Sequence, residues 1–130
     1  MPATQRITQV SLFLIAAIAI LGGSLQMFLG QPDTSPRLDN VHRFMAGIYL
    51  GTGFIALWTA TTIRRQDELV FLLALGVMLA GIGRLVSISQ VGLPQPAALW
   101  LGYLIPELVL PVVIALTQLA TRSARMPLAA

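Results

Sequence analysis

Four long apolar windows constrain this chain more than any other feature. They cover residues 10–29, 44–63, 69–88 and 97–119, and the first two contain no charged residue. A helix that crosses the hydrocarbon core of a bilayer needs about 20 mostly apolar residues. The sequence therefore predicts an all-α integral membrane protein, a four-helix bundle of transmembrane helices. Because the connections are too short for another folded unit, we expect residues 1–130 to form a single transmembrane bundle.

Composition supports the lipid bilayer as the main partner of this chain. It is 56% hydrophobic and 10% charged, with a mean hydropathy of +0.82, which does not fit the surface of a soluble domain. The arginines are scattered, whereas a nucleic-acid site needs a clustered basic face, so we expect no nucleic-acid partner. The absence of cysteine excludes disulfides and thiolate chemistry. Since His42 is the one histidine, a multi-histidine metal site is excluded too.

The first apolar window follows Arg6, as the core of a secretory signal follows a basic residue. A signal core has roughly 7–15 apolar residues and ends at a cleavage site with small residues. This window is longer, and no such pattern follows it. We therefore expect an uncleaved membrane anchor.

The distribution of arginines indicates the orientation. An even number of spans puts both termini on one side of the membrane. The arginines near that side are Arg6, Arg64, Arg65, Arg122 and Arg125, whereas Arg37 and Arg43 lie on the other side. Because short cytoplasmic segments carry the excess of Lys and Arg, we expect the termini in the cytoplasm. Dual topology remains the alternative.

Pairs of small residues four apart occur in three of the windows. They are Ala19 and Gly23, Gly47 and Gly51, and Gly76 and Ala80. Helices in lipid associate by close approach at small residues. We expect these pairs to form packing seams, either within the monomer or between monomers of a homo-oligomer.

Two charged residues, Arg84 and Glu107, lie inside the windows. Charges at such depth normally face a partner or a water-filled cavity. Arg84 lies about 22 Å along the third window and Glu107 about 15 Å along the fourth, at 1.5 Å per residue. Side chains lean toward the N-terminus of their own helix, and these two helices run in opposite directions. The sequence therefore predicts an Arg84–Glu107 ion pair, which is either a structural tie or part of a ligand or ion site.

Further polar residues are expected on the same side of the membrane as this pair. They are Asn40, Arg43, Tyr49, Ser87, Tyr103 and Gln26. Pro111 lies four residues after Glu107 and removes the helical donor to the Glu107 carbonyl. A polar pocket in the outer half of the bundle would satisfy such a carbonyl, although a simple helix bend is the alternative. We treat the polar residues, with Arg84 and Glu107, as a ligand-binding or structural cluster; no catalytic residue or metal ligand is assigned.

Three segments together resemble a known family. They are Leu38-Asp-Asn-Val-His-Arg-Phe-Met-Ala-Gly-Ile-Tyr-Leu50, then Gly81-Ile-Gly-Arg-Leu-Val-Ser87 with Gly92-Leu-Pro94, and Pro106-Glu-Leu-Val-Leu-Pro111. This pattern is similar to the small bacterial membrane proteins grouped as domain of unknown function 4345. The resemblance implies four spans and a multi-pass protein of the bacterial inner membrane, with no established activity or cofactor. Its signature positions would be Asn40, Arg43, Phe44, Gly47, Tyr49, Gly81, Arg84, Ser87, Gly92, Pro94, Glu107 and Pro111.

Three classes of function remain open. The first is a membrane binding protein whose pocket holds a lipid headgroup, a quinone or a small anion, or an accessory subunit of a larger membrane complex. The second is a small proton- or ion-coupled transporter that uses Glu107, although Arg84 would stabilise the ionised carboxylate and so oppose proton release. The third and least expected is a lipid-modifying enzyme, because no nucleophile with a base and no repeated acidic motif is visible.

Overall fold

The computed structural model describes residues 1–126, and these residues form helices without any strand. The helices are α1 (Ala3–Leu29), α2 (Pro36–Thr61), α3 (Glu68–Val91) and α4 (Ala97–Arg125), with a short 3-10 turn, η1 (Ile63–Arg65), between α2 and α3. Each of the four long helices is long and apolar enough to cross a membrane. The predicted all-α membrane class is therefore confirmed. Residues 127–130 of the expected bundle lie outside the described part.

The helices are longer than the apolar windows. Helix α1 begins at Ala3 instead of residue 10, and α4 continues to Arg125. The segment between the first two apolar windows, residues 30–43, is about half helical, because α2 already begins at Pro36. Ser35 caps this helix by accepting a hydrogen bond from the Leu38 amide at 3.3 Å. Hydropathy marks only the part of a helix inside the hydrocarbon, whereas the helix itself continues into the hydrated interface.

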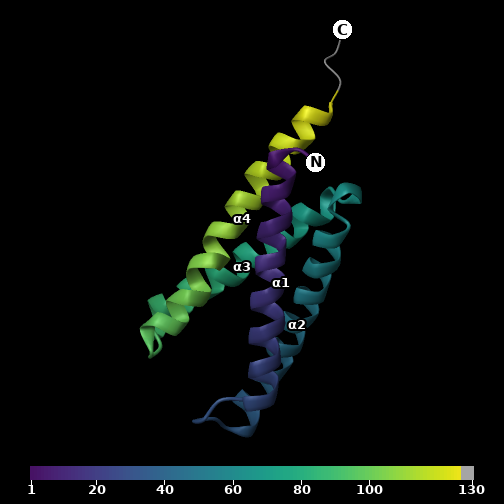
Figure 1. Ribbon diagram of the computed structural model, residues 1–130. Helices are drawn as coiled ribbons and strands as arrows, with labels where there is room; N and C mark the ends of the chain where they lie inside the picture. Colours follow the sequence, from purple (N-terminus) through teal and green to yellow (C-terminus); the bar gives the residue numbers. More distant parts are fainter. Residues whose placement is uncertain (127–130) are drawn as a thin grey trace.

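The four helices form two hairpins, α1–α2 and α3–α4. Helix α1 packs along α2 and also against α4, whereas α2 and α3 make little contact. Figure 1 shows the two hairpins drawn together at one end and spread apart at the other, where the connections 30–35 and 92–96 lie. The bundle is therefore more open between α2 and α3 than between α1 and its neighbours.

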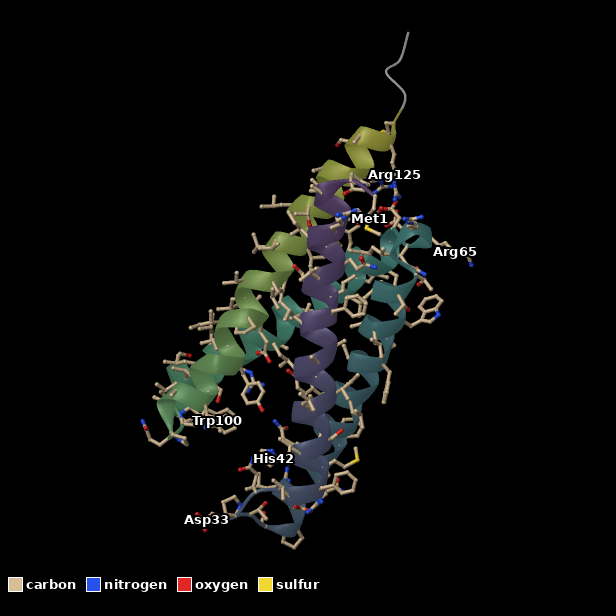
Figure 2. All side chains as sticks on the ribbon, in the orientation of Figure 1. Met1, Asp33, His42, Arg65, Trp100 and Arg125 are labelled. Carbon is tan, nitrogen blue, oxygen red and sulfur yellow. The ribbon has the colours of Figure 1, made fainter. Side chains whose placement is uncertain are left out.

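Both described chain ends lie at the same end of the bundle. In Figure 2, Met1, Arg65 and Arg125 lie at one end, which we call the terminal end. Asp33 and His42 lie at the opposite end, which we call the loop end. This is the arrangement expected from four antiparallel crossings.

The seam between α1 and α2 rests on small residues. A Cβ atom added at Gly23 would lie 2.8 Å from the Leu50 amide nitrogen, so the two backbones are in contact there. Gly53 approaches α1 as closely. In contrast, a Cβ at Gly51 or Gly76 would meet nothing within 4 Å. Of the three predicted small-residue pairs, the Ala19 and Gly23 pair packs fully inside the monomer, because the other two each include a glycine in open space.

Candidate functional site

Arg84 and Glu107 form a two-point ion pair between α3 and α4. The Nε atom of Arg84 lies 2.6 Å from Oε2 of Glu107, and Nη2 lies 3.1 Å from Oε1. The side chain of Glu107 is 4% exposed and that of Arg84 is 27% exposed. Two parallel N–H···O bonds are the strongest arrangement for this pair of groups. The contact predicted from the opposed lean of the two side chains is present.

Aromatic rings from α4 surround the same guanidinium. The Cζ atom of Arg84 lies 5.3 Å from the ring centroid of Tyr103 and 5.9 Å from that of Trp100. These distances are in the range of cation–π attraction. Of the five N–H donors of an arginine, two point to Glu107, which leaves others for an additional acceptor.

Tyr49 of α2 and Tyr103 of α4 both lie against the same glycine of α1, Gly22. A Cβ added at Gly22 would lie 3.3 Å from Oη of Tyr103 and 3.3 Å from Cε1 of Tyr49. The missing side chain at Gly22 thus leaves room for two phenol rings, one from α2 and one from α4. Helices α2, α3 and α4 supply the side chains of the site, which we define as the polar cluster Tyr49, Arg84, Tyr103 and Glu107, and α1 leaves space for it at Gly22. Gly22 was missed in the sequence, where nothing distinguishes it from the adjacent Gly23.

A cleft of about 450 Å³ lies beside this cluster, and we call it the inter-hairpin cleft. All four helices line it, and its wall is apolar apart from Tyr49, Thr52 and Glu107. Gly76 and Ala80 widen it on the α3 side. Ligand pockets in proteins are typically about 300–1,000 Å³, so this volume suits a small molecule or part of a lipid.

The cleft lies deeper than the pocket expected in the outer half of the bundle. Its lining residues on α3 and α4, such as Gly76 and Glu107, are near the middle of their helices. Pro106 is itself part of the wall, and Pro111 is buried. Pro106 thus lines the cleft, but because the cleft wall is apolar, a polar pocket that satisfies the freed Glu107 carbonyl stays a prediction.

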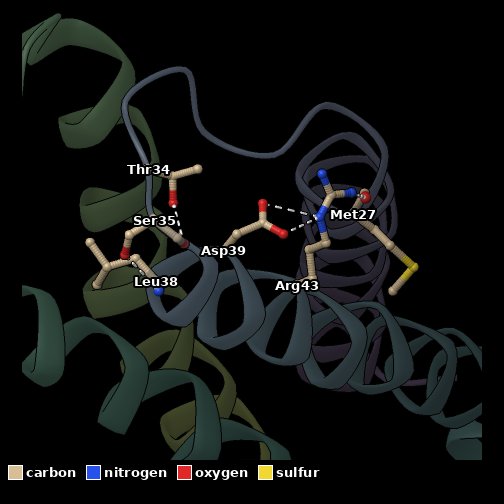
Figure 3. Close-up of polar contacts among 6 residues, drawn as sticks. All are labelled: Met27, Thr34, Ser35, Leu38, Asp39 and Arg43. Atoms are coloured by element: carbon tan, nitrogen blue, oxygen red, sulfur yellow. Dashed lines mark hydrogen bonds and ion pairs between the residues drawn. The ribbon is translucent and has the colours of Figure 1, made fainter.

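Arg43 belongs to a separate contact at the loop end. Its Nε lies 2.9 Å from Oδ2 of Asp39, one turn earlier on α2, and its Nη1 donates to the carbonyl of Met27 (Figure 3). A cation suits the carbonyl-rich C-terminus of a helix, here that of α1. Both partners of Arg43 lie on the first hairpin, so the structure does not show it joining the Arg84–Glu107 pair.

The remaining predicted residues form no hydrogen bond to the ion pair in the described structure. Asn40 and Ser87 are exposed, and Gln26 is half-buried on α1. For Asn40 and Gln26, which lie on the first hairpin, the windows predict only depth along each helix, and the two hairpins spread toward the loop end. Residues at the same depth on different hairpins are therefore not necessarily neighbours.

A polar seam at the terminal end was missed in the sequence. The hydroxyls of Thr8 and Thr117 are 2.7 Å apart, and those of Thr4 and Thr121 are also 2.7 Å apart. These two bonds join α1 to α4. The signal was available: two threonines four apart occur near each end of the chain, in the order that antiparallel helices require.

Gln118, next to this seam, is fully buried. Its Nε2 donates to Oδ1 of Asp67 at 3.0 Å, and its Oε1 has no hydrogen-bond partner in the described structure. The terminal end is thus joined by side-chain hydrogen bonds between elements, whereas the opposite ends of the hairpins stay apart.

Comparison with known proteins gives one match. The model of a family described as Domain of unknown function (DUF4345) matches residues 7–118. Neither a curated protein nor a solved structure matches the chain. Within residues 1–126, no group of three His, Asp or Glu side chains is arranged to hold a metal ion.

Proposed function

The chain belongs to the DUF4345 family, which is uncharacterised, and from that premise we propose that it binds an uncharged, lipid-soluble molecule with acceptor oxygens at its polar head. A quinone has this chemistry. The observation that carries the proposal is the apolar inter-hairpin cleft, whose wall includes Tyr49 and Glu107, the latter paired with Arg84.

The shape of the cleft supports an apolar tail. Its wall is almost entirely hydrocarbon, and α2 and α3, which both contribute to it, make little contact with each other. A molecule dissolved in the bilayer could therefore enter sideways between these two helices. No aqueous path is needed for such a ligand.

The charge balance of the site favours a neutral head group. Glu107 and Arg84 neutralise each other, and Glu107 is almost completely buried. A small anion would add an uncompensated charge to a buried neutral pair, and burying a charge without a partner is costly. A carbonyl oxygen avoids that cost and could accept a hydrogen bond from an unused Arg84 N–H or from the Tyr49 hydroxyl. Among the ligands considered, a quinone or an uncharged lipid head is therefore supported better than an anion.

The same contact argues against a proton-coupled transporter. Such a carboxylate has to release and regain its proton, whereas both oxygens of Glu107 face the guanidinium. An enzyme has less support still, because the polar cluster contains no nucleophile with a neighbouring base.

We place the protein in the bacterial inner membrane with its terminal end in the cytoplasm. The five arginines of the terminal side support this orientation through the positive-inside rule. Binding a membrane ligand is compatible with a role as an accessory subunit, and co-purification of a larger complex would identify that role.

The test is binding of a short-chain ubiquinone to the purified protein in detergent, measured as the rise in melting temperature. Ala80→Leu narrows the cleft, and Gly83→Leu adds the same side chain to α3 at a position with open space that does not line the cleft. We expect the ubiquinone to stabilise the wild type and Gly83→Leu, but not Ala80→Leu. Equal stabilisation of all three would contradict a site in the cleft.

A further inference from the structure

A second hollow lies at the terminal end, away from the inter-hairpin cleft. We propose that it binds the phosphate of an anionic phospholipid headgroup. The hollow has a volume of about 370 Å³ and is formed around the turn from α2 to α3. Residues that line it include Gln9 of α1 and Thr61, Thr62, Arg64 and Arg65 of the turn.

The two arginines of this turn have no acidic partner in the described structure. The nearby acids are engaged elsewhere: Arg122 lies 3.4 Å from Asp67 and 3.2 Å from Glu68. The two guanidinium groups of Arg64 and Arg65 are exposed and flank the same hollow. Their positive charge is therefore not balanced by the protein.

The backbone of the turn from α2 to α3, which forms the hollow, accepts hydrogen bonds from side chains of α1. Nε2 of Gln9 donates to the Ala60 carbonyl at 2.9 Å, and Nε2 of Gln5 donates to the Ile63 carbonyl at 3.4 Å. Ile63 itself is fully buried. The turn is consequently held in one position against α1, which reduces the ordering needed when a ligand binds.

The location and the chemistry of the hollow fit a lipid phosphate. The turn lies where two membrane-crossing helices end, and Arg65 is at the terminal end in Figure 2. Arginine presents its N–H groups in a planar fork that matches phosphate oxygens. Exposed apolar side chains on the preceding turns of α2, such as Trp58 and Ile55, offer a surface for acyl chains. A free phosphate ion would gain nothing from that surface.

The proposal is tested by retention of phosphatidylglycerol on the purified protein, counted by native mass spectrometry, with phosphatidylcholine as the neutral comparison. The variant is Arg64→Gln with Arg65→Gln. The matched control is Arg6→Gln with Arg125→Gln, which removes the same charge from two exposed terminal-end residues outside the hollow. Melting temperatures establish that each variant is folded.

We expect the Arg64 and Arg65 variant to retain phosphatidylglycerol about tenfold less well, the control to retain it nearly as the wild type does, and phosphatidylcholine to be unaffected. Equal losses in both variants would overturn the site and indicate general surface charge. Displacement of the lipid by millimolar inorganic phosphate would overturn the lipid as the ligand. If the double variant does not fold, the single variants Arg64→Gln and Arg65→Gln are each expected to show part of the loss, and unchanged retention in both would equally refute the proposal.

Discussion

Glu107 binds Arg84 through both carboxylate oxygens, and the same guanidinium lies 5.3 Å from the ring centroid of Tyr103, one turn earlier on α4. A single side chain of α3 is thus held by two residues of α4. The pair joins the helices of the second hairpin beside the inter-hairpin cleft, where Glu107 forms part of the wall. The charge of the Arg84–Glu107 pair and its position beside the cleft therefore both determine which ligands the cleft can bind.

The first prediction concerns the strength of this pair. Glu107→Gln leaves the positive charge of Arg84 without its partner, and removing one member of a buried ion pair typically costs about 3–5 kcal/mol. We expect a loss of this order in the free energy of unfolding, measured by SDS titration in mixed micelles. Adding Arg84→Gln is expected to relieve most of that loss.

The control for this cycle is Glu68→Gln, which alters a carboxylate whose side chain is 76% exposed. It is expected to change stability by less than about 1 kcal/mol. If the losses from Glu107→Gln and Arg84→Gln are additive, the pair is not coupled and the prediction is wrong.

The second prediction compares the effects on stability of replacing two helical glycines, Gly23 and Gly51, by alanine. Gly23→Ala places a Cβ 2.8 Å from the Leu50 amide nitrogen, so the backbones of α1 and α2 have to separate. We expect a loss of about 1–3 kcal/mol. Gly51→Ala meets open space, and alanine favours a helix by about 1 kcal/mol over glycine. The unfolding free energy should therefore fall in the first variant and stay equal or rise in the second; losses in both would contradict the packing described.

A third prediction concerns the threonine seam. Thr8→Val and Thr117→Val each remove one partner of the 2.7 Å hydroxyl contact between α1 and α4. Side-chain hydrogen bonds between membrane helices contribute about 0.6 kcal/mol on average and up to about 2 kcal/mol. We expect a coupling energy in that range from the double-mutant cycle. Thr52→Val is the control, because its hydroxyl bonds to the Ile48 carbonyl of its own helix; a cycle between Thr8 and Thr52 should show no coupling.

Much of the fold could be predicted from the sequence because one physical requirement dominates it. A helix that crosses hydrocarbon has a known length, so four windows predict four helices. The Arg84–Glu107 contact was predictable for a related reason: depth and side-chain lean follow from the rise per residue and from the direction of each helix. Both inferences need only positions along the helix axes.

What the sequence did not reveal depends on rotation about those axes. The close packing of α1 against α2 depends on which faces of these helices carry Gly23 and Gly53, and many rotations satisfy the same windows. Arg43 was grouped with Glu107 by depth alone, but it contacts Asp39 and the end of α1. The role of Gly22, which leaves room for Tyr49 and Tyr103, is visible only when three helices are in place.

The most direct test of the proposed ligand site is fluorescence quenching of Trp100, whose ring lies 5.9 Å from the Arg84 guanidinium. In a Trp58→Phe variant, Trp100 is the one remaining tryptophan. We predict that a short-chain ubiquinone quenches its fluorescence with saturation at one molecule per chain. Adding Tyr49→Phe should raise the half-saturating concentration by about tenfold, as expected for the loss of one hydrogen bond at the head group. Quenching that rises linearly with concentration and is equal in all variants would contradict the site, because that is the behaviour of a quencher dissolved in the micelle.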